Sequence, residues 1–199
     1  LSGMGADEIF GGYRKHLSVL LARRYRQFVP QFVREGPIRT MVQSLPVAGW
    51  NRGFRLLRWA KRFERSASLP DLDCFIGNFA YYTPASLLKM LTPDFRASWY
   101  DIHTVRRHVE EADRRPQGSL LSLMTALDAK LYLPGLNLMY SDKAGMAASV
   151  EIRVPFVDHE VVSYAMNLPD RDRIRGLCQK YALKQIARRY LPAAVVDRP

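Results

Sequence analysis

The first thirteen residues combine four glycines with two adjacent acids, a composition suited to holding a nucleotide. The glycines permit positive φ angles and let backbone N–H groups approach a ligand closely. Asp7 and Glu8 would repel a phosphate group unless a divalent cation lay between their carboxylates and the phosphate. A carboxylate that binds a Mg²⁺ ion, which in turn binds the phosphate oxygens, is the usual arrangement. The loop therefore predicts either a magnesium-nucleotide site or a tight turn in which Asp7 caps a helix.

A second polar segment lies closer to the C-terminal end. In an extended chain Glu151 and Arg153 project to one face, while the apolar residues that alternate with them project to the other. The pair is interpreted either as a direct contact to substrate or as a buried ion pair that fixes a helix to a strand. Asp142 and Lys143, just upstream, leave the same two interpretations open.

The histidines and cysteines form no competing site. The four histidines are scattered, with no ligand pair at helical spacing, so surface or packing roles are expected of them. Cys74 and Cys178 show no C-x-x-C motif and predict neither zinc nor a disulfide framework. Ser2 lacks the G-x-S-x-G frame of a hydrolase nucleophile.

The charge of the chain is concentrated in one segment. The 199 residues carry a net charge of +11, and residues 13–66 alone hold thirteen Lys and Arg against two acids. Apolar residues recur there at roughly helical spacing, which predicts a basic helical hairpin. Its arginines are either a solvated surface over an apolar stripe or a site for nucleic acid or a carrier partner. No run of 18 apolar residues occurs, so a membrane span is unsupported.

The elements that must position these residues are mainly helices. The Thr-Pro pairs at residues 83–84 and 92–93 are helix start signals, and Pro134 with Gly135 is expected to end the strongest helix. Turns are expected around residues 36–37 and at Pro46, and an extended segment over residues 150–156. The expected helices cover residues 17–33, 52–63, 71–82, 84–90, 101–114, 119–132, 136–148, 158–166 and 179–190, with one more that begins at Pro93.

Three ordered motifs resemble the synthetase domain of the glutamine-dependent asparagine synthetases. The opening residues resemble its S-G-x-G-x-D-E-x-F-G-G-Y motif, and residues 142–158 resemble its D-x-x-x-M-x-x-x-x-E-x-R-x-P-F-x-D signature. The Tyr190-Leu191-Pro192 triplet resembles its C-terminal Y-L-P sequence. The motifs cover about forty residues directly, and the basic hairpin contains no motif of the family.

The resemblance implies an α/β domain of the ATP-pyrophosphatase type, of which the visible part is predominantly helical. Such an enzyme is a cytoplasmic ligase of asparagine biosynthesis that adenylates a carboxylate, releases pyrophosphate and transfers ammonia from glutamine. By position, the resemblance assigns ATP contacts to Ser2, Gly3 and Gly5, and Mg²⁺ to Asp7. It also suggests catalytic roles for Glu151 and Arg153.

The same resemblance divides the chain into three functional segments. A nucleotide and magnesium loop is expected over residues 1–13, the basic hairpin over residues 14–66 and a helical signature region over residues 119–199. The chain is expected to be the C-terminal part of one synthetase domain. The amidotransferase domain and the S-G-G-x-D-S phosphate loop would lie upstream, and a lysine that steadies the transition state would lie beyond Pro199.

Met4 is the main departure from the family pattern. It occupies the position where the members that amidate aspartate carry Glu, and a thioether has no titrating group for proton transfer. A carboxylate acceptor other than aspartate therefore becomes credible.

The isolated chain is expected to show no ATP–pyrophosphate exchange. Its expected partners are small molecules, namely ATP, an aspartate-like carboxylate and ammonia from glutamine, rather than a membrane or nucleic acid. The full-length protein could form a homodimer. The alternative function is a basic helical module that binds nucleic acid and in which the glycine loop is only a turn.

Overall fold

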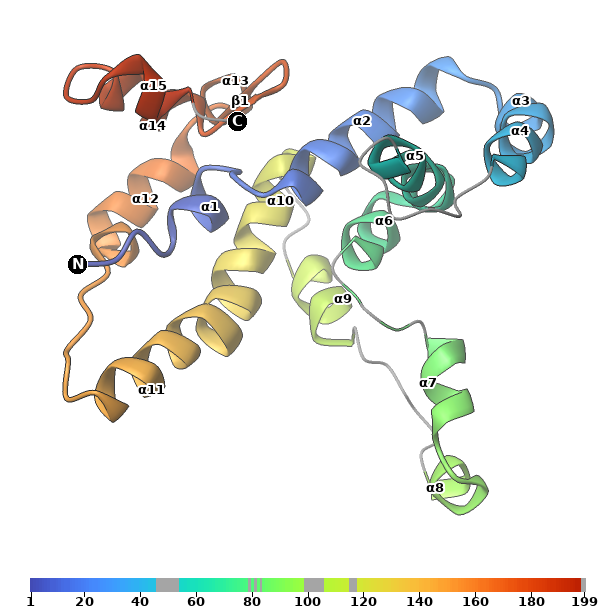
Figure 1. Cartoon of the computed structure of the whole chain (residues 1–199), viewed down its shortest axis with the longest axis horizontal. Coiled ribbons are helices and arrows are strands. Elements are labelled where there is room, and N and C mark those ends of the chain that lie inside the picture. The colour runs from blue at the N-terminus through green and yellow to red at the C-terminus, as the bar shows by residue number, and fades with distance from the viewer. Residues whose placement is uncertain are drawn as a thin grey trace. The chain divides into compact units, whose positions relative to one another are not determined.

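The chain folds into short helices, as its sequence predicts (Figure 1). The computed structural model describes residues 1–45, 54–78, 80, 82, 84–98, 106–114 and 118–197. These residues form two compact units, one of residues 1–17 with 110–199 and the other of residues 18–109. No described helix is both long enough and apolar enough to cross a lipid bilayer.

The first unit holds both predicted chemical segments. Its helices are α1 (Ala6–Ile9), the start of α2 (Arg14–Phe28), the end of α9 (Arg106–Asp113), α10 (Leu120–Leu127), the π-helix η2 (Asp128–Leu138), α11 (Met139–Ala147), the 3₁₀ turn η3 (Pro155–Val157), α12 (His159–Asn167), α13 (Asp170–Arg173), α14 (Tyr181–Ala187) and α15 (Ala193–Val196). Two short strands, β1 (Ile174–Arg175) and β2 (Cys178–Gln179), pair antiparallel.

The second unit holds the basic segment. Its elements are the rest of α2, α3 (Gln31–Val33), the π-helix η1 (Arg34–Ile38), α4 (Arg39–Ser44), α5 (Phe54–Ala67), α6 (Asp71–Gly77), α7 (Pro84–Met90), α8 (Pro93–Ser98) and most of α9. On α5 the rings of Trp59 and Phe63 stack with their centroids 5.3 Å apart. The helix starts predicted at Pro84 and Pro93 are confirmed. The turn predicted at Pro46 lies outside the described residues.

Two predicted breaks are wrong, and π-helical geometry explains both. Pro134 was expected to end a helix, yet it lies inside η2, and α10, η2 and α11 form one long helical rod. Pro37 lies likewise inside η1 rather than in a turn. A proline removes one N–H donor and crowds the preceding turn, and the wider π-helix can accommodate it.

The helix α1 is packed between the rod and α12 (Figure 1). Ile9 and Phe10 are buried with Ala165 of α12, and the ring of Phe10 meets that of Phe156 edge-on at 6.3 Å. The α12 helix begins where the Asp158 side chain accepts a hydrogen bond from the N–H of Glu160. This core holds the N-terminal loop against the segment that precedes α12.

The only sheet in the described part of the chain is the β1–β2 pair. The resemblance implies an α/β domain, but residues 1–4 form no strand. The predicted extended segment is confirmed over residues 150–154 and passes into η3 instead of reaching Phe156. The mainly helical character of the visible chain is therefore confirmed, while the ATP-pyrophosphatase fold stays a prediction.

Candidate functional site

The glycine loop lies directly beside the segment that carries Glu151 and Arg153. The backbone N–H of Ser2 donates a hydrogen bond of 2.8 Å to the carbonyl of Arg153. Two motifs at opposite ends of the sequence thus meet, as a shared site requires. The predicted nucleotide contact of Ser2 does not come from its backbone N–H, because that group already has a partner.

Gly5 has a structural reason to be glycine. Its φ of +94° is the left-handed conformation, and a Cβ there would lie 2.9 Å from Cγ2 of Val157. Gly3 differs, since a Cβ at that position would meet nothing within 4 Å. The open space beside Gly3 suits close approach of a ligand, whereas Gly5 faces protein. ATP contact by either glycine stays a prediction.

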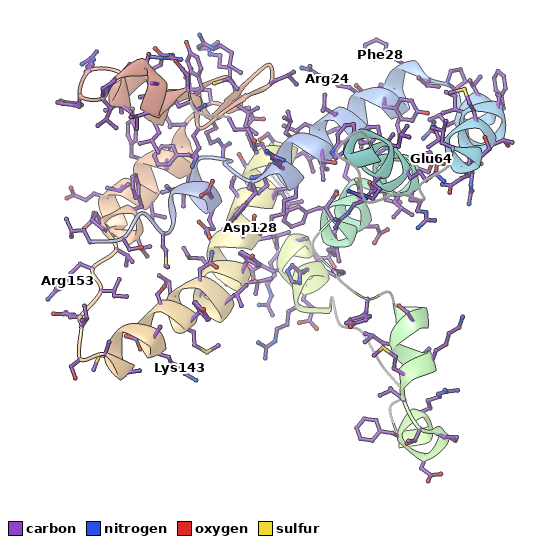
Figure 2. The ribbon with its side chains drawn as sticks, in the orientation of Figure 1. Arg24, Phe28, Glu64, Asp128, Lys143 and Arg153 are labelled. Atoms are coloured by element: carbon purple, nitrogen blue, oxygen red, sulfur yellow. The ribbon has the colours of Figure 1, made fainter. Side chains whose placement is uncertain are left out.

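Glu151 and Arg153 form an ion pair on the surface. Arg153 Nη2 lies 2.9 Å from Glu151 Oε1, and their side chains are 73% and 71% exposed. The expected shared face is therefore confirmed, and Figure 2 shows Arg153 on the side of the extended segment that faces away from α11. The alternative of a buried pair is wrong for these two residues. Both are free to meet a ligand, because a surface pair of this kind holds only about 0 to 1 kcal/mol.

Asp7 lies in the first turn of α1 and keeps an accessible carboxylate. Its side chain is 39% exposed, and its Oδ1 lies 3.1 Å from Lys180 Nζ, immediately before α14. Gly12 permits this position, because a Cβ at residue 12 would collide with Asp7 Oδ1. The carboxylate thus faces a cation instead of being enclosed in protein.

Glu8 has a purely structural environment. It is 1% exposed and accepts hydrogen bonds from Tyr13 Oη at 2.7 Å and Asn137 Nδ2 at 2.6 Å. Burial and the neighbouring Glu8 carboxylate raise the pKa of the Tyr13 phenol, which therefore stays protonated and donates to Glu8. Glu8 is committed to fixing the loop on η2 and is not placed to bind a metal.

Met4 faces α11. The buried Ser141 hydroxyl lies 2.9 Å from the Met4 sulfur and donates to it. The residue that departs from the family pattern therefore touches the helix of the second motif. A thioether is a weak acceptor and carries no proton, so it contributes contact and shape at this point rather than acid or base chemistry.

A pocket of about 390 Å³ lies between the rod and the extended segment. Its lining comprises Leu138, Met139, Ser141, Asp142, Ile152 and Val154. Gly145 lets the two walls approach, since a Cβ there would lie 2.6 Å from the carbonyl oxygen of Val150. The Met4 and Ser141 contact places the N-terminal loop next to this pocket.

Sequence reasoning missed a buried charge cluster at the base of the loop. Asp128 is 2% exposed and receives Lys15 Nζ at 2.5 Å on one oxygen and His16 Nε2 at 2.7 Å on the other. The Lys15 ammonium also lies over the Tyr132 ring, 4.4 Å from its centroid. Burial lowers the pKa of Lys15, although Asp128 opposes that shift. No local pattern announces a pairing between residues so far apart in sequence.

A second buried charge orders the C-terminal part. The Arg173 guanidinium is 1% exposed and donates to Thr125 Oγ1, Ser122 Oγ and Asp170 Oδ1 at 3.0, 2.6 and 2.8 Å. It ties α13 to α10. Burial lowers the pKa of Arg173, and the Asp170 carboxylate opposes that shift. All three partners accept hydrogen bonds, which suits a guanidinium because it has only donors.

The loop can supply one ligand to Mg²⁺. Among the residues that the structure describes, no group of three or more His, Cys, Asp or Glu side chains could hold a metal. Mg²⁺ in nucleotide sites is commonly held by one or two carboxylates together with phosphate oxygens and waters. Asp7 fits that role once its ion pair with Lys180 opens, whereas Glu8 does not because its carboxylate already accepts hydrogen bonds from protein side chains.

Comparisons with known proteins agree with the motifs. A family model described as asparagine synthase matches residues 1–199. The chain is 34% identical over 200 residues to proteins of Mycobacterium bovis and Mycobacterium tuberculosis named putative asparagine synthetase [glutamine-hydrolyzing]. It is also 30% identical over 201 residues to a Bacillus subtilis protein named asparagine synthetase [glutamine-hydrolyzing] 1.

These relatives are much longer than the chain. The matches cover 100% of this chain but 28% of the mycobacterial proteins and 29% of the Bacillus protein. No solved structure matches. The family model extends over every residue, and the loop and the signature segment that characterise the family meet in space: the chain belongs to the asparagine synthase family.

Proposed function

We propose that the chain forms part of the synthetase site of an ATP-dependent, amide-forming ligase. The enzyme would adenylate a carboxylate and pass ammonia from glutamine to it, with release of AMP and pyrophosphate. The observation that carries the proposal is the hydrogen bond between Ser2 and Arg153, because it joins the predicted nucleotide loop to the predicted acceptor segment. The named relatives, which are asparagine synthetases, support the same reaction class.

In the proposed reaction, Asp7, Lys180 and Ser2 would each act on the magnesium ion or the nucleotide. Asp7 would hold the magnesium ion, which would neutralise phosphate charge and keep the leaving pyrophosphate in place. Lys180 lies where its ammonium can share that charge once the ion pair opens. Ser2 would direct its hydroxyl to the nucleotide beside the open space at Gly3.

The pair Glu151 and Arg153 would face the acceptor or the nucleotide. Arg153 carries a permanent positive charge suited to a carboxylate or a phosphate. Glu151, 2.9 Å away, would fix the guanidinium in position until the ligand arrives. Met4 brings no proton donor or acceptor, so any base needed for ammonia transfer comes from another residue or from water.

Buried and partly buried side chains that pair with one another provide the rigid support that such a site needs. Glu8, Tyr13 and Asn137 fix the loop to η2, and the Asp128 cluster lies directly behind Tyr13. Because these groups are already paired, they position the loop and do not touch the ligand.

The alternative of a nucleic-acid module is weaker. Part of the basic charge is already used inside the second unit, where Arg23 and Arg26 pair with Asp71 and Lys61 donates to the carbonyl of Gln43. The family match covers the basic segment together with the rest of the chain.

ATP–pyrophosphate exchange in the protein expressed from its whole gene tests the proposal. We expect exchange that requires Mg²⁺ and a carboxylic acid, and a loss of about 100-fold or more in Asp7→Asn, the scale of removing one preorganised charge. Glu160→Gln, an exposed acid on α12, is the matched control and should leave the rate unchanged. Exchange that survives Asp7→Asn at all Mg²⁺ concentrations would remove Asp7 from the site.

A further inference from the structure

The pocket beside Met4 has a chemistry that the motifs do not predict. Four of its six lining residues are apolar, namely Leu138, Met139, Ile152 and Val154. Its volume of about 390 Å³ is suited to a small organic molecule. The polar lining consists of Ser141 and Asp142 alone.

Ser141 does not offer its proton to a ligand. Its hydroxyl is buried and donates to the Met4 sulfur at 2.9 Å. Met4 thereby closes this wall with a thioether, where a carboxylate would have added a second negative charge. The remaining polar group of the pocket is the exposed carboxylate of Asp142.

No basic side chain belongs to the lining. Lys143 follows Asp142 on α11 but is not part of the pocket, and Arg153 is paired with Glu151 on the opposite face of the extended segment. Figure 2 shows Lys143 and Arg153 at the outer edges of this region. A ligand carboxylate inside the pocket would therefore meet apolar walls and a like charge, which is unfavourable.

We propose that this pocket binds the non-reacting end of the acceptor, and that it selects a protonated amine on an apolar chain over a second carboxylate. The inference rests on the proposed function, since it names the acceptor class of the same enzyme. The acceptor's reacting carboxylate would lie towards the loop, and its ammonium group would pair with Asp142. Aspartate, with its second carboxylate and short chain, fits this lining poorly.

Three acids of the same chain length test the selection: ε-aminocaproate, which carries an amine, caproate, which carries none, and adipate, which carries a second carboxylate. Their binding to the protein expressed from its whole gene is measured by calorimetry without ATP, and each is then tried in ATP–pyrophosphate exchange next to aspartate. We expect ε-aminocaproate to bind about three- to fivefold more tightly than caproate, which corresponds to about 0.6 to 1 kcal/mol for a pair with an exposed carboxylate, and adipate to bind most weakly.

Asp142→Asn should abolish this preference for ε-aminocaproate and leave the binding of caproate unaffected. Lys143→Gln, the neighbouring exposed residue, is the matched control and should change neither. Val154→Phe fills the pocket from its other wall and should weaken ε-aminocaproate and caproate alike. A normal melting temperature for each variant shows that the fold is retained.

The outcomes separate the two proposals. If no acid supports exchange but the preference for ε-aminocaproate and its loss in Asp142→Asn remain, the pocket stands and the ligase proposal falls. Tighter binding of adipate or aspartate, an unchanged preference in Asp142→Asn, or no binding of any acid because other residues of the complete protein fill the pocket, would each overturn the inference.

Discussion

Replacing Asp128 by Asn should loosen the first unit around the base of the loop. Asp128 is 2% exposed, and its two oxygens hold Lys15 and His16 at 2.5 and 2.7 Å. Breaking a buried pair by removing one charge costs about 3 to 5 kcal/mol, because the remaining charge has no partner. We expect about 3 kcal/mol, the lower end, since the amide oxygen of Asn can still accept from Lys15 and Glu8 also favours its charge.

The pH dependence identifies Lys15 as the cause. Burial lowers the pKa of Lys15 from its ordinary value of 10.5, so between the folded and the unfolded pKa the unfolded chain binds more protons. Stability therefore rises with pH across that window and falls as the pH drops through it. Without Asp128 the pKa of Lys15 in the folded protein decreases further. The rise of the unfolding free energy with pH, which is at most about 1.4 kcal/mol per pH unit, then begins at lower pH.

Hydrogen exchange followed by mass spectrometry measures this locally in the complete protein. A loss of about 3 kcal/mol raises the exchange rate of protected amides in α10 and η2 about 100-fold. Glu160→Gln, on the surface of α12, should leave those rates unchanged. Replacing Lys15 and Asp128 together by Met and Leu should recover much of the loss. Equal exchange in Asp128→Asn and wild type, or a loss independent of pH, would refute the assignment of a buried ion pair.

Three further predictions concern single positions. Arg173→Ala leaves three acceptors without their donor and should lower the free energy of opening for amide exchange in α10 by about 3 kcal/mol, whereas the exposed Arg171→Ala should change it by less than about 0.5 kcal/mol. Gly5→Ala should destabilise the loop by about 1 to 2 kcal/mol, because φ is +94° and Val157 is in the way, while Gly3→Ala should be neutral in thermal melting; equal effects would contradict the packing argument. Lys180→Met should lower the Mg²⁺ concentration for half-maximal exchange about two- to fivefold, as expected for releasing Asp7 from an exposed pair, and an increase would show that Lys180 itself binds the phosphates.

The sequence was most informative where function imposes a local pattern. The alternation around Glu151 predicts a shared face, and the structure has it. The glycine loop precedes a helix, but the prediction that Asp7 caps this helix is wrong, because the N-cap of α1 is Gly5 and Asp7 lies in the first turn. Helix starts at Thr-Pro pairs were predicted because proline acts on its immediate neighbours. These signals need only a few adjacent residues.

Long-range pairing and helix type could not be predicted in the same way. Lys15 and Asp128 lie 113 residues apart, and Asp7 and Lys180 belong to segments with no common pattern. Pro134 was expected to end a helix because proline disrupts the interior of an α-helix, and that rule does not apply to the π-helix η2 in which Pro134 lies. The interpretation of Glu151 and Arg153 as a buried ion pair was wrong, since both side chains are exposed. Exposure depends on which other segments of the protein pack over a residue, and the residue's own type does not specify those segments.

We infer that the N-terminal loop and the Glu151 segment bind one nucleotide together. The most direct test is hydrogen exchange of the complete protein with and without magnesium-ATP. We expect slower exchange to appear together in residues 1–12 and 150–154, and Asp7→Asn to remove it from both. Protection confined to the basic helices α2 to α5, with the loop and the segment unchanged, would contradict it.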